Sequence, residues 1–125
     1  MNPHEQLIFD LVRSELRPEF IPTDYRNKVN SKYCGHCHHA TIAMYVLLDG
    51  KNNGYKVRKA IDEVNIKHYW LESPAGEIID PTAEQYTDLG RPIPYNARIT
   101  RGVSHLRSMP AKTIIENVRS KLQQR

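Results

Sequence analysis

One stretch of this sequence is apolar in every direction around a helix, and it constrains the fold more than any other. From Cys37 to Leu48 the chain reads CHHATIAMYVLL, with apolar side chains at almost every position after His39. A helix without a polar face has to be surrounded by the rest of the protein. The segment therefore predicts a buried central helix that begins at Cys37, stops near Asp49 and Gly50, and is followed by a KNNG loop.

The flanking patterns predict a helix at each end of the chain and a small sheet between them. Asn2 is suited to cap a helix that has Pro3 in its first turn and a capping-box Glu5, and Pro110 opens a final helix with an apolar side. Strands are expected at 55–61, 66–71 and 77–80, a short helix or turn at 81–90, and irregular chain at 18–33 and 91–104. The prediction is one α+β domain, residues 1–125, in which the buried helix packs on a small antiparallel sheet.

Composition narrows the classes of protein to which the chain can belong. With 125 residues, 39% of them hydrophobic and 26% charged, the chain is expected to build one modest core. No apolar run approaches the ~20 residues of a membrane span. The first residues, MNPHEQLIFDLV, lack the pattern of a secretory signal. We therefore expect a cytoplasmic protein with free thiols and no membrane partner.

Positive charge is concentrated in the last third of the chain. Residues 1–90 carry 10 Lys/Arg and 13 Asp/Glu, a net charge of −3, whereas residues 91–125 carry 8 Lys/Arg and one acid, a net charge of +7. Such a tail can steer an acidic partner or a nucleic acid. No aromatic residue follows Tyr95 to stack on a base, which weakens the nucleic-acid interpretation. A solvated helix face explains the charge more simply.

Both cysteines lie in the motif CGHC, Cys34 to Cys37, which has several known chemistries. A thioredoxin-like thiol–disulfide oxidoreductase uses these letters, but it needs a buried strand directly before them, and residues 19–33 are polar and interrupted by Pro22. Cys34, Cys37 and His38 also spell a c-type haem attachment motif. Haem attachment normally follows export, for which the sequence offers no signal.

Zinc is a stronger alternative for the same motif. Cys34 and Cys37 have the spacing of a zinc knuckle, and the ligand set can be completed by two histidines from among His36, His38, His39 and His68. No second C-x-x-C or H-x-x-x-H pair is present. In this hypothesis the protein is a zinc-stabilised binding module, whose basic tail contacts nucleic acid or an acidic protein.

The remaining hypothesis makes Cys37 a nucleophile at the start of the buried helix, where the helix dipole favours a thiolate. A nucleophilic thiol needs an imidazole, and the imidazole needs an orienting group. If Ser73-Pro74-Ala75 is a three-residue turn in HYWLESPAGEIIDPT, His68 faces Asp80 across a hairpin, on the same face as Trp70 and Ile78. The helix that carries Cys37 is expected to pack against that face. We therefore predict Cys37, His68 and Asp80 as catalytic residues, without metal or cofactor.

The run GHCHHAT…HYWLES…GEIIDPTAEQY, roughly residues 33–86, resembles the transglutaminase-like branch of the papain-like cysteine fold. It is most similar to small uncharacterised bacteriophage proteins with the series G-H-C-x-x-A-[ST], H-[YW]-[WF]-L and I-D-P-T-x-x-Q. The resemblance implies that Cys37 is the nucleophile, His68 the general base and acid, and Asp80 its orienter. It also implies a protease-like hydrolase, deamidase or acyltransferase, acting on a protein or peptide-like amide, isopeptide or thioester, in the host cytoplasm if the source is a virus.

The chain departs from papain-like proteases in two respects. Those enzymes place a Gln shortly before the Cys to complete the oxyanion hole, whereas this sequence has Gln6 and then no Gln until Gln85. The backbone N–H of the nucleophile can supply one donor, and the candidates for the second are Asn30, His38 and Gln85. The chain also has little room for a second lobe. We therefore expect a short substrate, an exposed side-chain amide or a flexible tail.

Overall fold

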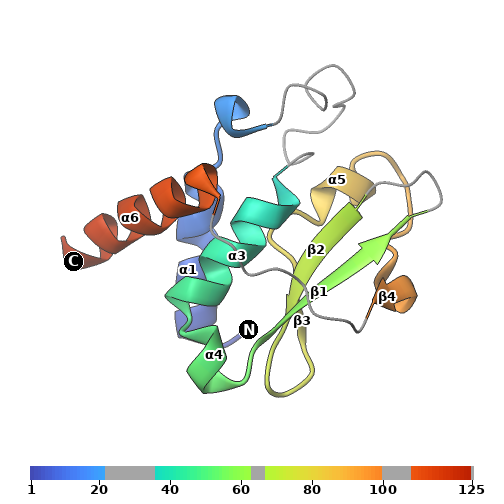
Figure 1. Cartoon of the computed structure of the whole chain (residues 1–125), viewed down its shortest axis with the longest axis horizontal. Helices are drawn as coiled ribbons and strands as arrows, with labels where there is room; N and C mark the ends of the chain where they lie inside the picture. The colour runs from blue at the N-terminus through green and yellow to red at the C-terminus, as the bar shows by residue number, and fades with distance from the viewer. Residues whose placement is uncertain (22–35, 63–66, 100–107, 125) are drawn as a thin grey trace.

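The structure is a computed structural model that describes residues 1–21, 36–62, 67–99 and 108–124, with residues 97–99 described by their backbone alone. Three longer helices stand beside a small sheet (Figure 1): α1 (Pro3–Ser14), α3 (Cys37–Leu47) and α6 (Met109–Gln123). The short helices are α4 (Gly50–Asn53), α5 (Glu84–Thr87), η1 (Pro18–Phe20) and η2 (Tyr95–Ala97). The strands are β1 (Lys56–Ile61), β2 (Lys67–Glu72), β3 (Ile78–Ile79) and β4 (Arg98–Ile99).

The terminal helices begin as the sequence predicts. Asn2 and Glu5 form a reciprocal capping box, in which each side chain accepts a 2.8 Å hydrogen bond from the other residue's backbone N–H. Ser108 caps α6 by accepting from the backbone N–H of Ala111 at 3.3 Å. Within the described ranges, no helix is both long and apolar enough to cross a membrane.

The buried helix predicted from the sequence is α3, and it lies at the centre of the molecule. It packs between the sheet on one side and α1 and α6 on the other (Figure 1). Ala40 and Met44 are fully buried in a core that they share with residues of all three layers, namely Ile8, Val12, Val57, Leu71, Ile79, Ile114 and Val118. The α+β class, with a helix packed on a small antiparallel sheet, is confirmed.

The chain after α3 differs from the prediction. Asp49 takes the left-handed conformation that ends the helix, with φ of 50°, and the expected KNNG loop contains the helical turn α4. Gly50 is the first residue of that turn and is buried. A Cβ atom at this position would collide with the ring and the backbone of Tyr45, so the turn requires glycine here.

The sheet is antiparallel in the order β3-β2-β1-β4. Strand β4 was not predicted, because Pro92 and Pro94 mark its surroundings as irregular, yet its backbone pairs with β1. The predicted register of the β2–β3 hairpin was wrong by two residues. Leu71 pairs with Ile79, so the turn is one residue further along than expected, and the backbone N–H of Ser73 donates to the carbonyl of Glu77 at 2.8 Å.

The helix covers the other face of β2 from the one predicted. Side chains alternate along a strand, and it is Leu71, with Tyr69 beside it, that belongs to the core under α3. His68 and Trp70 point to the opposite face and are buried there. Cys37 nevertheless reaches His68, because it is the first residue of α3 and lies at the end of the helix that meets the beginning of β2.

Candidate active site

The contact between His68 and Asp80 is present as predicted. His68 Nε2 lies 2.6 Å from Asp80 Oδ2, and both side chains are buried. Asp80 directly follows β3 instead of lying within it. The two-residue error in register did not separate the pair, because a shift by an even number keeps a side chain on the same face of the sheet. His68 therefore meets Asp80 diagonally across the hairpin.

The Asp80 carboxylate is held by three hydrogen-bond donors. Oδ2 accepts from His68 and also from the Tyr95 hydroxyl at 2.8 Å, while Oδ1 accepts from the backbone N–H of Thr82 at 3.1 Å. An ionised carboxylate only accepts hydrogen bonds, so these partners suit the charged form. They also fix which nitrogen of His68 carries a proton towards Asp80, namely Nε2.

Nδ1 is therefore the nitrogen of His68 that is available for chemistry. It is buried and has no hydrogen-bond partner within the described part of the chain. Burial acts to lower the pKa of His68, but the hydrogen bond to Asp80, the interaction with Cys37 and the charges of both outweigh burial and raise this pKa to about 9. At neutral pH the ring is consequently an imidazolium that can give up a proton from Nδ1.

Cys37 lies beside His68 and interacts with its ring. Its Sγ donates to the carbonyl oxygen of Lys67, the residue before His68, across 3.6 Å. The interaction of Cys37 with the ring is one of the causes that raise the pKa of His68. Since Asp80 holds Nε2, Nδ1 is the ring nitrogen that is left for the thiol. Cys37 is also the first residue of α3, whose first internal bond runs from Ala40 N to His36 O. The amides before Ala40 are thus not used inside the helix and form its positive end.

Aromatic rings surround the imidazole. Trp70 stacks on His68 with ring centroids 5.7 Å apart, and Tyr86 meets it edge-on at 4.9 Å. The hydroxyl of Tyr86 donates to Asp62 at 2.9 Å, and the guanidinium of Arg91 donates to the same carboxylate oxygen at 3.3 Å. Asp62 thereby ties α5 to the end of β1, and Tyr86 is held against the face of the sheet that carries His68.

Each of the other residues that the sequence singled out either takes no part in the contact between His68 and Asp80 or lies outside the described residues. Cys34 and Asn30 lie outside the described residues, so the geometry of the complete CGHC motif does too. The His38 ring packs edge-on against Tyr69 at 4.9 Å, towards the helix-covered face of the sheet. Gln85 is buried on α5, and its Oε1 has no hydrogen-bond partner in the described ranges. Within those ranges, no three His, Cys, Asp or Glu residues form a group that could hold a metal ion.

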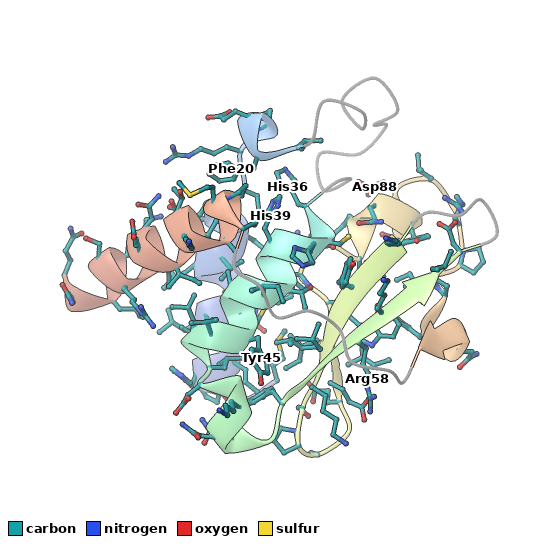
Figure 2. All side chains as sticks on the ribbon, in the orientation of Figure 1. Phe20, His36, His39, Tyr45, Arg58 and Asp88 are labelled. Carbon is teal, nitrogen blue, oxygen red and sulfur yellow. The ribbon has the colours of Figure 1, made fainter. Side chains whose placement is uncertain are left out.

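A pair of histidines lies at the start of α3. His36 Nδ1 and His39 Nε2 are 2.6 Å apart and buried, and Figure 2 shows both rings near Phe20 of η1. Burial lowers the pKa of His36 to about 4. Burial, together with the charges of His36 and His38, lowers the pKa of His39 to about 3. The pair is therefore neutral at physiological pH, with one ring donating to the other.

This pair predicts loss of stability in acid. Below the unfolded pKa of ~6.5 the unfolded chain takes up protons that the folded pair excludes, so the free energy of unfolding falls from pH ~6.5 towards pH 4. We expect a loss of up to about 3 kcal/mol for each histidine over that interval, and so up to about 6 kcal/mol for the pair. Urea titrations at each pH measure it, and His36→Gln/His39→Gln should have a clearly shallower slope. Equal slopes in the two proteins would contradict this assignment.

Comparisons with protein-family models, with curated proteins and with solved structures found no match to this chain. Its chemistry is therefore inferred from its own side chains. Sequence patterns did not point to Tyr86, Tyr95 or Asp62, which belong to the segments around α5 and η2 and to the end of β1. Nothing in their local sequence marked them, because aspartate is common in turns and tyrosine occurs seven times in this chain.

Proposed function

We propose that this chain is a Cys-His-Asp acyl-transfer enzyme, with Cys37 as nucleophile, His68 as general base and acid, and Asp80 as the residue that orients His68. One observation carries the proposal: a buried imidazole is fixed by a carboxylate through Nε2, and a thiol at the start of a helix interacts with the same ring. This is the arrangement that a thiol needs in order to act as a nucleophile.

The first half of the reaction forms an acyl-enzyme. The Cys37 thiolate attacks the carbonyl carbon of an amide, isopeptide or thioester, and the C=O electrons move onto oxygen. The backbone N–H of Cys37 and the positive end of α3 stabilise that oxyanion. His68 then gives its Nδ1 proton to the leaving nitrogen or sulfur as its bond to carbon breaks. The products are a thioester on Cys37 and a neutral His68.

The second half releases the acyl group. His68 Nδ1 takes a proton from water or an amine, which attacks the thioester carbonyl, and the C–S bond breaks to restore the thiolate and the imidazolium. Water gives hydrolysis or deamidation, and an amine gives transamidation. Asp80 accepts the hydrogen bond from Nε2–H of His68 throughout, so that proton stays on the ring. Nδ1 therefore serves as both the base and the acid.

A papain-like, transglutaminase-like core is the architecture we propose for this chemistry. The order of parts supports it: the thiol begins a buried helix, the imidazole lies on β2, and the carboxylate follows the next strand. We propose a peptide-like substrate that is short, flexible or an exposed side chain, and a cytoplasmic site of action. An acidic substrate steered by the basic tail stays a prediction, because Arg101, Arg107 and the side chain of Arg98 lie outside the described residues.

Thiol alkylation tests the assignment of the nucleophile. Iodoacetamide at pH 6 should modify Cys37 well before Cys34, because His68, with a pKa of about 9, is then an imidazolium beside the Cys37 sulfur. Mass spectrometry of peptides from a time course identifies the site, and the same protein in urea supplies the rate of an unperturbed thiol. In the Cys34→Ser variant, iodoacetamide should label Cys37 as fast as it does in the wild-type protein.

Two results would overturn this assignment. The first is faster modification of Cys34 than of Cys37 in the native protein. The second is modification of both thiols in the native protein at the rate found in urea. Either result would remove the basis for an activated Cys37. Metal analysis of the purified protein separates the main alternative, since stoichiometric zinc together with slow labelling of both thiols would favour the zinc-stabilised binding module. Loss of activity in Cys34→Ser would favour the oxidoreductase or the zinc site.

A further inference from the structure

We infer that Tyr95 is a positioning residue of this site, whose hydroxyl shares one oxygen of Asp80 with His68 and so limits how tightly the carboxylate holds the imidazolium. The inference rests on the proposed function for its relevance to catalysis. Its geometry does not, because the contact between Tyr95 and Asp80 exists whatever reaction the site performs.

Two donors meet at a single oxygen atom. Asp80 Oδ2 accepts from His68 Nε2 at 2.6 Å and from the Tyr95 hydroxyl at 2.8 Å. Oδ1 is occupied by the backbone N–H of Thr82, so the carboxylate cannot rotate to give each donor an oxygen of its own. Tyr95 and His68 therefore compete for the same negative charge.

Tyr95 is itself fixed by packing. Its ring meets Trp70 edge-on at 5.0 Å, and Trp70 stacks on His68. Burial, the charge of Asp80, the hydrogen bond to Asp80 and the charge of Glu84 raise the pKa of Tyr95 far above its ordinary value. The phenol consequently stays protonated, and thus remains a donor, over the whole pH range in which His68 titrates.

Within the described ranges, few other charged groups lie near this pair. His68 is faced by Asp80 from the end of the hairpin, by Cys37 from α3, by the ring of Tyr86 from α5, and by Tyr95 from η2. The further charged groups lie behind these residues: Asp62 and Arg91 at the Tyr86 hydroxyl, and Glu84 in an ion pair with Arg13. Among the described residues, Asp80 is thus the principal acceptor that acts on His68, and a change in its acceptor strength reaches the imidazole directly.

The chemical consequence is a moderated general acid. The positive end of the Tyr95 O–H dipole withdraws charge from Oδ2 and weakens its attraction for the imidazolium. A less tightly held proton is more readily given to a leaving group, since the best catalytic acid has a pKa near the working pH. Without the hydroxyl, His68 should hold its proton more tightly.

The test is a proton titration of His68 in Tyr95→Phe, which keeps the ring against Trp70 and removes the hydroxyl. We expect the pKa of His68, followed by NMR of the ring and assigned with His68→Gln, to rise by ~0.5–1 unit above wild type. The alkaline limb of acyl transfer to a small thioester should move upward by the same amount. A merely structural role would change the rate or the stability but not this pKa.

Tyr55→Phe is the matched control. Tyr55 also donates its hydroxyl to a carboxylate, Glu5 Oε2 at 2.6 Å, and it lies at the far end of β1 from the His68 contacts. This variant should leave the titration of His68 unchanged. An unchanged pKa in Tyr95→Phe, a fall in that pKa, or an equal shift in Tyr55→Phe would each overturn the inference.

A second variant keeps the inference testable if Tyr95→Phe does not fold. 3-Fluorotyrosine at position 95 retains the hydroxyl but makes it a stronger donor, so it should lower the pKa of His68. A rise or no change would contradict the inference. The titration of His68 and the labelling of Cys37 are independent measurements. A shifted titration with an unreactive Cys37 would remove the proposed function and leave the role of Tyr95. A reactive Cys37 with an unshifted titration would leave the proposed function and remove the role of Tyr95.

Discussion

Asp80→Asn is expected to slow acyl transfer by about 10³- to 10⁴-fold, because an amide cannot satisfy the partners of this carboxylate. All three neighbours of Asp80 are donors, and asparagine has one acceptor oxygen. An amide NH₂ towards His68 would force the ring to carry its proton on Nδ1, where the thiol needs an acceptor. An NH₂ towards Thr82 would instead oppose a backbone N–H.

The measurement is the rate of hydrolysis of a small thioester or activated ester, with NMR of His68 in parallel. The pKa of His68 should fall from about 9 in the same variant, because the charge that raises it is removed. Asp10→Asn is the matched control, since Asp10 is exposed on α1 and its Oδ1 accepts a hydrogen bond from the side-chain amide of Gln6 at 3.0 Å. A loss below about tenfold, with a folded protein, would show that Asp80 does not orient the base.

Cys37→Ser is expected to lose still more, on the order of 10⁴-fold or beyond, since a serine hydroxyl at this position is not activated as a thiolate. The change removes one polarisable sulfur and leaves the size of the side chain almost unchanged, so α3 and its contacts should persist. Rates with the same thioester measure the effect, and circular dichroism checks the fold. Cys34→Ser supplies the control at the chain's other cysteine.

The parts of this protein that the sequence predicted are those in which local pattern and burial agree. The residues of α3 have no polar face, so a buried helix was the one arrangement that satisfied them. The capping box at Asn2 and Glu5 is a local arrangement and formed as expected. The pairing of His68 with Asp80 was predictable because the alternation of strand side chains survives an even error in register.

The parts that were not predictable depend on contacts across the sheet. A turn one residue later than expected changed the register, and it did so without any change in the alternation that sequence patterns report. Strand β4 is recognisable by its pairing with β1, not by the composition around Pro92 and Pro94. Tyr95 reaches Asp80 because η2 folds back onto the hairpin, and no periodic pattern records that approach.

The most direct test of the account is to trap the acyl-enzyme. Mixing the protein with a small activated ester and quenching in acid should yield one acyl group per chain by intact-mass spectrometry, located on Cys37 by peptide mapping and released by hydroxylamine as a thioester is. Cys37→Ser should show no such adduct, and Cys34→Ser should show it in full. An adduct on Cys34 or on lysines, or acylation no faster than in the urea-unfolded chain, would contradict the claim that Cys37, His68 and Asp80 form an acyl-transfer site.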